Sequence, residues 1–190
     1  MSSLALIPEN PQHCYHYLMA HRRGLPLEDN LATMLASWIF GMGALPNWLG
    51  LDKPRFQWLF NYHFPTSGLL QVPTNRPVDP DRFAEMADLR ELLLNHRNLR
   101  SDSEILVADI IVAGCMGQNH LWQDLGLRNR QDLSELMQQN FKSLVEKNNK
   151  DMKWKKFLYK QLCEAEGIYT CRVPSCDVCK DYANCYGSET

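Results

Sequence analysis

The sequence predicts an all-α protein, an irregular bundle of about six helices that ends in a cysteine-rich C-terminal loop segment. Apolar residues recur with the 3.6-residue spacing of an amphipathic helix between breaks made by proline and glycine. No alternating apolar and polar run is long enough for a strand. Four of the seven cysteines lie in one short C-terminal stretch. We therefore expect a helical domain over residues 1–166 and, packed on it, a cysteine-rich segment over residues 167–190.

Local end signals support the expected helices. Asp52 is positioned as an N-cap with Pro54 in the first turn, and Ser101 with Glu104 forms a capping-box pattern. Gly167 stands where a helix would end in a left-handed residue. The helix after Ser101 is apolar almost all round, so we expect it at the centre of the bundle. The expected helices cover residues 27–40, 53–64, 81–98, 103–117, 130–146 and 151–166.

One uncharged stretch, residues 31–51, must be distinguished from a membrane span. Gly41, Gly43 and Pro46 interrupt it after about ten helical residues, roughly half of what a bilayer requires. The first residues of the chain lack the basic start and apolar run of a secretory signal. We therefore expect a buried core helix in a cytoplasmic protein that makes no membrane contact.

The charge balance and the side-chain inventory argue against two other classes of protein. The net charge is −2 and the pI is near 6.3, whereas a nucleic-acid-binding domain is usually basic. No Ser/His/Asp set or pair of carboxylates stands out as catalytic machinery. We expect a protein that is not an enzyme and does not bind nucleic acid.

The C-terminal cysteines form one compact motif, Cys-x4-Cys-x2-Cys-x5-Cys, made of Cys171, Cys176, Cys179 and Cys185. In a reducing compartment, clustered cysteines are more often metal ligands than disulfides. Four thiolates suit an iron–sulfur cluster or a structural zinc ion. Zinc ribbons usually present two separate Cys-x2-Cys pairs, and the ligand sites of a four-iron cluster are spread widely enough to suit unequal gaps. The chemistry favours iron–sulfur and leaves zinc or redox thiols as alternatives.

Several segments give the chain a resemblance to a known family. Residues 151–187, which carry the whole cysteine motif, and residues 108–127, ADIIVAGCMGQNHLWQDLGL, resemble the NifQ family of nitrogen-fixation proteins. The segment WIFGMGALPNWLGLD is more loosely similar to the N-terminal half of that family. The resemblance implies a metallocluster carrier that donates molybdenum for assembly of the nitrogenase iron–molybdenum cofactor. A helical interaction module with a structural zinc site held by the four cysteines is the alternative.

The resemblance also carries implications for cofactor and partners. It implies that Cys171, Cys176, Cys179 and Cys185 hold an iron–sulfur cluster of the Fe4S4 or MoFe3S4 type, with molybdenum as the cargo. It implies that the recipient is the nitrogenase cofactor-assembly scaffold, together with the nitrogenase iron protein.

His120, where the chain leaves the apolar central helix, is a candidate metal ligand. Neutral imidazole binds transition metals, and its second nitrogen could be held by Asp124, four residues on. The alternative is a helix-end histidine that bonds to backbone carbonyls. Because GQNHLWQDLGL resembles the family's own run, we expect His120 to bind molybdenum or to lie beside the cluster.

Other candidate residues have simpler interpretations. We expect Cys14 and Cys115 to be non-ligands, Cys115 as a core residue, and Cys163 to be a buried helix thiol rather than an auxiliary ligand. Lysines on one face of the last helix form either a solvated face or a docking surface for an acidic partner. These lysines are Lys153, Lys156 and Lys160. Three histidines of the N-terminal segment, expected to be solvated, are His13, His16 and His21.

Overall fold

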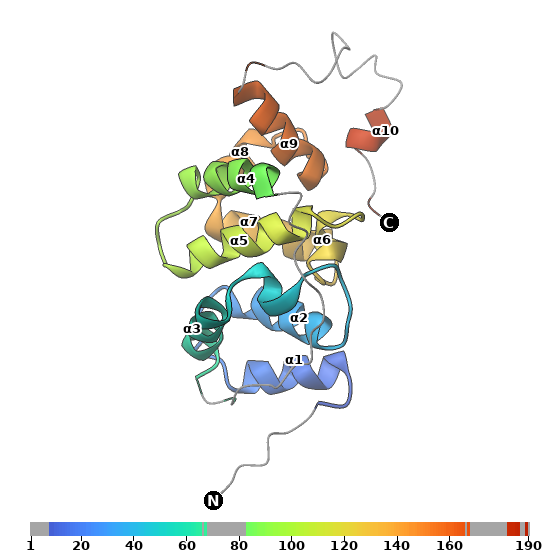
Figure 1. Ribbon diagram of the computed structural model, residues 1–190. Helices are drawn as coiled ribbons and strands as arrows, with labels where there is room; N and C mark the ends of the chain where they lie inside the picture. Colours follow the sequence, from blue (N-terminus) through green and yellow to red (C-terminus); the bar gives the residue numbers. More distant parts are fainter. Residues whose placement is uncertain are drawn as a thin grey trace, which may run out of the picture.

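All regular structure in the part of the chain that the computed structural model describes is helical (Figure 1). That part comprises residues 8–65, 67, 83–165, 167, 182–186 and 189. Its elements are α1 (Pro11–Ala20), α2 (Glu28–Ile39), the 3-10 helix η1 (Asn47–Gly50), α3 (Lys53–His63), α4 (Phe83–Asn95), α5 (Ser103–Cys115), α6 (Leu121–Asp124), α7 (Arg130–Asn140), α8 (Lys142–Lys147), α9 (Trp154–Ala165) and α10 (Tyr182–Cys185).

The all-α prediction is confirmed, but the count of about six helices is too low. Ten α-helices lie within the described residues. The helix expected over residues 130–146 is broken at Phe141, whose φ of −140° and ψ of 49° are not helical. A further helix, α1, begins after Asn10, whose side chain accepts a hydrogen bond from the N–H of His13 at 2.8 Å. The expected loop character of residues 167–190 falls mostly outside the described residues, and α10 lies within that segment.

Two of the expected helix starts can be compared with the structure. Asp52 is the N-cap of α3, and its Oδ1 accepts a hydrogen bond from the N–H of Arg55 at 2.8 Å, as expected. Before α5, the hydrogen bonds of Glu104 differ from those of the expected capping box. The carboxylate of Glu104 accepts from the N–H groups of Leu99 and Arg100 at 2.8 and 3.0 Å, rather than from the N–H of Ser101.

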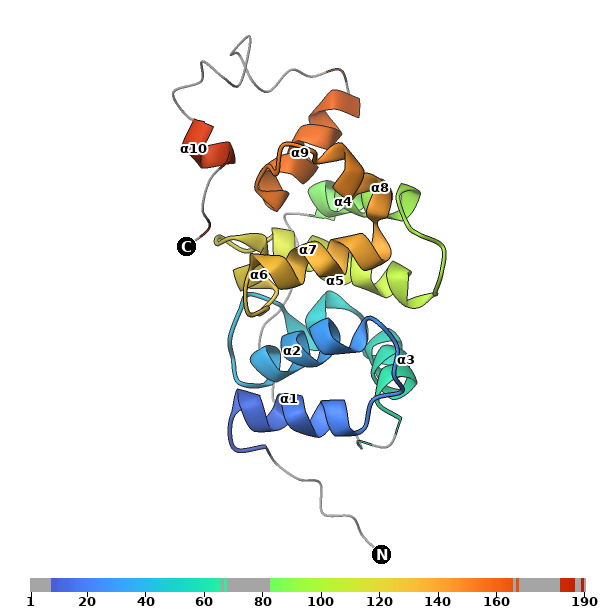
Figure 2. The ribbon, with the colours of Figure 1, turned by 180° about the vertical axis from the view of Figure 1, so that it is seen from behind.

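Helix α5 runs through the middle of the molecule, as its nearly uniform apolar surface predicted. Eleven of its thirteen residues are buried. Figures 1 and 2 show α1, α2 and α3 grouped toward one end, α4, α8 and α9 toward the other, and α5 with α7 between them. This arrangement lets one central helix contribute to burial of both groups.

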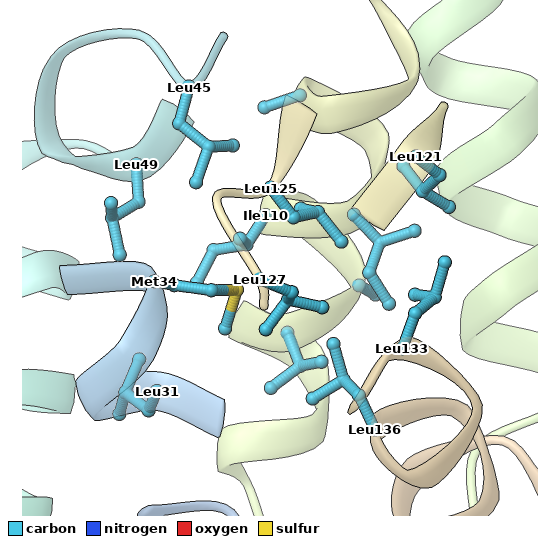
Figure 3. Close-up of a cluster of buried hydrophobic side chains, with 14 of the residues drawn as sticks. Leu31, Met34, Leu45, Leu49, Ile110, Leu121, Leu125, Leu127, Leu133 and Leu136 are labelled. Atoms are coloured by element: carbon cyan, nitrogen blue, oxygen red, sulfur yellow. The ribbon is translucent and has the colours of Figure 1, made fainter. Parts of the chain in front are cut away.

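The core joins the two groups of helices and fixes the position of α6. In Figure 3, apolar side chains from α2, the η1 region, α5, α6 and α7 converge on one cluster. A Cβ added to Gly114 of α5 would lie 2.7 Å from the side chain of Leu125, so α6 packs closely on α5. Burial of each leucine, isoleucine or methionine side chain in this cluster contributes roughly 1.5–3 kcal/mol to the stability of the fold. The labelled members are Leu31, Met34, Leu45, Leu49, Ile110, Leu121, Leu125, Leu127, Leu133 and Leu136.

The uncharged stretch noted in the sequence forms the buried helix α2 and the turn after it. Ten of the twelve residues of α2 are buried. Among the described residues, no helix combines the length and apolar character needed to cross a bilayer.

The fold brings together a serine, a histidine and a glutamate that sequence inspection did not single out. His63 Nε2 lies 2.9 Å from Ser103 Oγ, and its Nδ1 lies 3.5 Å from Glu28 Oε1. All three residues are at most 2% exposed, and the Glu28 carboxylate also accepts from the N–H groups of residues 23–25. Burial lowers the pKa of His63, with Glu28 opposing this shift. A hydroxyl without solvent access cannot meet a substrate, so the trio holds α2, α3 and α5 together.

Candidate metal centre

A pocket of about 650 Å³ opens where α6, the start of α9 and the C-terminal segment meet. Both ribbon views place α10 next to this end of α9 (Figures 1 and 2). The walls carry amides, lysines, one imidazole and one carboxylate. The lining residues are Gln118, Asn119, His120, Leu121, Gln123, Lys153, Lys155, Lys156, Asn184 and Glu189. We call this cavity the basic pocket.

The buried carboxylate of Asp124 organises the floor of the basic pocket. Asp124 is fully buried, and its Oδ2 accepts from the Asn119 N–H at 3.0 Å and from Lys155 Nζ. Lys155 Nζ also donates to the Gly117 carbonyl at 2.8 Å. A Cβ on Gly117 would lie 2.3 Å from Asp124 Cγ, so only glycine fits there. Together these contacts lock the loop before α6 to the first turn of α9.

His120 is the N-cap residue of α6. The prediction that Asp124 holds its ring is wrong. The Asp124 carboxylate bonds to Asn119 and Lys155, because the loop turns it inward toward α9. The His120 ring lies instead with its Nδ1 3.7 Å from Oε1 of Glu189. The side chain of His120 is 32% exposed and faces the basic pocket. The imidazole is therefore accessible to a ligand.

Cys185, the last residue of the cysteine motif, lies close to the same pocket. Its carbonyl accepts from the N–H of Lys153 at 2.8 Å, and Lys153 Nζ donates to the Ala183 carbonyl at 2.9 Å. The next residue, Tyr186, is 5% exposed and belongs to the core cluster. These contacts attach α10 to the start of α9 and leave the Cys185 side chain half-buried.

The other predicted ligands, Cys171, Cys176 and Cys179, lie outside the described residues. Within the described residues, no three His, Cys, Asp or Glu side chains are grouped so that they could hold a metal ion.

The cysteines outside the motif have distinct environments. Cys115 is 3% exposed and belongs to the core, as expected. Cys14 is fully buried on α1, and burial raises its pKa to about 11, so its thiol stays protonated and is a poor ligand. Cys163 on α9 is half-buried rather than enclosed.

The lysines expected on one face of the last helix are divided between two hollows. Lys153 and Lys156 line the basic pocket. Lys160 lies beside a separate hollow with Phe157 and Tyr186, and its Nζ is 3.5 Å from Glu164 Oε1. Docking of an acidic partner to this helix stays a prediction.

Two residues of the basic pocket were not anticipated. The sequence prediction did not distinguish Lys155 from the neighbouring lysines. A signal was available, because several lysines at the start of a helix, with no acidic residue in its first turn, oppose the helix dipole and so suggest a special environment. Glu189 lies 69 residues from His120 in the chain, and nothing local indicates their proximity.

The described residues define a class: a small helical protein in which the last cysteine of the C-terminal motif, Cys185, adjoins a pocket with an imidazole and several cations. The family model described as NifQ matches residues 30–187 of the chain. Protein NifQ of Azotobacter vinelandii is 41% identical over 160 residues, which is 78% of this chain and 82% of that protein. Protein NifQ of Rhodobacter capsulatus is 31% identical over 160 residues, covering 84% and 87%. No solved structure matches the chain.

The chain therefore belongs to the NifQ family, which donates molybdenum for biosynthesis of the iron–molybdenum cofactor in nitrogen fixation. It is accordingly a molybdenum carrier rather than an enzyme.

The ion pair beneath the basic pocket gives a stability prediction. Replacing Lys155 by Met keeps the apolar stem but leaves the Asp124 carboxylate buried without its cation. We expect the free energy of unfolding to fall by about 3 kcal/mol, measured by urea denaturation. Lys156→Met is the matched control, because Lys156 is exposed and should change stability by less than about 0.5 kcal/mol. Equal, small effects of the two variants would contradict this account of the pocket floor.

Proposed function

We propose that Cys171, Cys176, Cys179 and Cys185 hold an iron–sulfur cluster of the Fe4S4 or MoFe3S4 type, through which the chain carries molybdenum. Thiolate sulfur is a soft ligand that suits iron–sulfur clusters. The four cysteines follow the spacing Cys-x4-Cys-x2-Cys-x5-Cys and lie in the segment that the NifQ family model matches. The observation that carries the proposal is the attachment of Cys185, the last of the four, beside the basic pocket.

The environment of the described thiols supports this choice of ligands. Cys14 and Cys115 are enclosed in the core, where a cluster has no room, whereas Cys185 is half-buried at the surface. Half-exposure allows a thiolate to bind metal and still allows the cargo to leave. The hydrogen bond between Cys185 and Lys153 supports a cysteine segment over residues 167–190 that packs on a helical domain over residues 1–166.

His120 supplies a ligand of a different kind. A mixed cubane has three irons, each completed by one thiolate, and its molybdenum corner takes more than four ligands. Oxygen or nitrogen donors are therefore needed in addition to sulfur. The partly exposed ring of His120 lines the same pocket as Asn184, the neighbour of Cys185. This proximity, across more than sixty residues of sequence, supports His120 as a molybdenum ligand or as a residue beside the cluster.

The proposed recipient is the nitrogenase cofactor-assembly scaffold, acting with the nitrogenase iron protein. A carrier must release its cargo, and a terminal surface segment opens at a lower free-energy cost than a site inside the core. Lys153, Lys156 and Lys160 are candidates for speeding association with an acidic partner surface, an effect that salt weakens.

The ligand assignment predicts that Cys179→Ala will deplete iron while the helical body stays folded. The body retains its own core, so far-ultraviolet circular dichroism should be unchanged. Iron is measured on protein isolated without oxygen. Cys163→Ala, which removes a half-buried thiol outside the motif, is the control and should keep its iron. Full iron content in the Cys179 variant would refute the assignment.

A second substitution separates the two metals. His120→Ala should keep the iron and lose most of the molybdenum, because the imidazole serves the molybdenum corner and not the irons. Both metals are measured on the same anaerobic sample. Normal molybdenum content would make His120 a structural helix-end residue, and equal loss of both metals would indicate a folding defect.

A further inference from the structure

The basic pocket has an unusual distribution of charge for the start of a helix. Lys155 and Lys156 lie in the first turn of α9 and Lys153 directly precedes it, while that turn contains no acidic residue. The N-terminal end of a helix carries partial positive charge, so cations there are unfavourable and anions are favourable. A bound anion would therefore stabilise a cation cluster at this position.

The lysines differ in how far they are already neutralised. Lys155 is paired with the buried Asp124 carboxylate and has little charge to offer. Lys153 donates one hydrogen bond to a backbone carbonyl, at Ala183, and keeps its formal charge. Lys156 is exposed, and its side-chain ammonium makes no hydrogen bond or ion pair with any residue that the structure describes. Two cations therefore remain for an anionic ligand.

Neutral donors complete the walls. The side-chain oxygen of Gln123 accepts from the His120 N–H at 3.1 Å, which orients the Gln123 amide so that its NH2 group is the part left to donate. Asn184 and Gln118 bring further amides to the lining. Ammonium groups together with amide NH2 groups are the donors that bind oxygen atoms of a small anion.

A carboxylate of the chain already lies inside the pocket. The side chain of Glu189 is 3% exposed, with Oε1 3.4 Å from Arg130 Nη1 and 3.7 Å from His120 Nδ1. Its Oε2 is buried and has no hydrogen-bond partner among the described residues. A buried, incompletely paired carboxylate is costly, so a competing anion with more oxygen atoms can displace it.

We propose that the basic pocket binds a tetrahedral oxyanion and that Glu189 competes with this anion for the same donors. Molybdate, the oxyanion of hexavalent molybdenum in water, belongs to this class, together with sulfate and phosphate. In this role the pocket would receive molybdenum before it reaches the cysteine segment. This part of the inference rests on the proposed function, in which the chain carries molybdenum through its cysteine-bound cluster. With a volume of about 650 Å³, it has room for such an anion and several water molecules.

The binding test uses the full-length chain with all four motif cysteines replaced by Ala, so that no cluster contributes. Sodium molybdate is titrated into this protein at low ionic strength by calorimetry, with folding checked by circular dichroism. We expect saturable binding of one anion. Lys156→Gln should weaken it about tenfold, the effect of losing one charge-assisted hydrogen bond. Lys160→Gln, on the same helix but outside the pocket, is the matched control and should leave the affinity unchanged.

Glu189→Gln tests the competition, because it removes the internal negative charge while keeping the size of the side chain. We expect molybdate to bind several-fold more tightly to this variant. Titrations with sulfate and with phosphate then show whether the pocket selects molybdate or accepts the class in general, and either result supports an oxyanion site.

The proposal is overturned if molybdate does not bind, if Lys156→Gln and Lys160→Gln have the same affinity, or if Glu189→Gln weakens binding. Because the motif cysteines are absent in this assay, these results are independent of the iron content of the Cys179 variant. Failure of the oxyanion site and failure of the ligand assignment can thus be told apart.

Discussion

The ion pair between Asp124 and Lys155 is the constraint on which the functional end of the molecule depends. It joins the end of α6 to the first turn of α9, and the Asp124 side chain is fully buried. The same two side chains hold the loop before α6, through the Asn119 N–H and the Gly117 carbonyl. Burying two charges costs desolvation energy that their attraction often only offsets, so such a pair is not retained for stability alone. Its value here is positional, because it sets where His120 and the lysines of α9 lie relative to one another.

The C-terminal segment depends on the same anchor. Once the start of α9 is fixed, Lys153 holds α10 through the carbonyls of Cys185 and Ala183. Tyr186 then enters the core, which gives the segment a second attachment. A carrier of the proposed kind needs this combination: the helical body defines one wall of the site, while the cysteines proposed as ligands belong to a separate segment attached to it.

Local sequence signals predicted the parts of the fold that local physics determines. The apolar surface of α5 required a central position, and Asp52 with Pro54 marked the start of α3. The break at Phe141 was missed because the residues on both sides of it keep a helical apolar spacing. The partner of His120 was also missed. Asp124 follows four residues later in the sequence, but its carboxylate bonds to Lys155, 31 residues further along the chain. The motif cysteines could be selected from spacing and resemblance, whereas Glu189 could be found only from the folded chain.

The central claim is that the protein carries iron–sulfur and molybdenum on its C-terminal cysteines. The most direct measurement is the content of iron, molybdenum and zinc in the wild-type protein isolated without oxygen, together with its absorption spectrum. The account predicts a brown protein that contains iron and molybdenum, with broad thiolate-to-iron absorbance at about 400 nm. A colourless protein that contains zinc and neither of the other metals would contradict it.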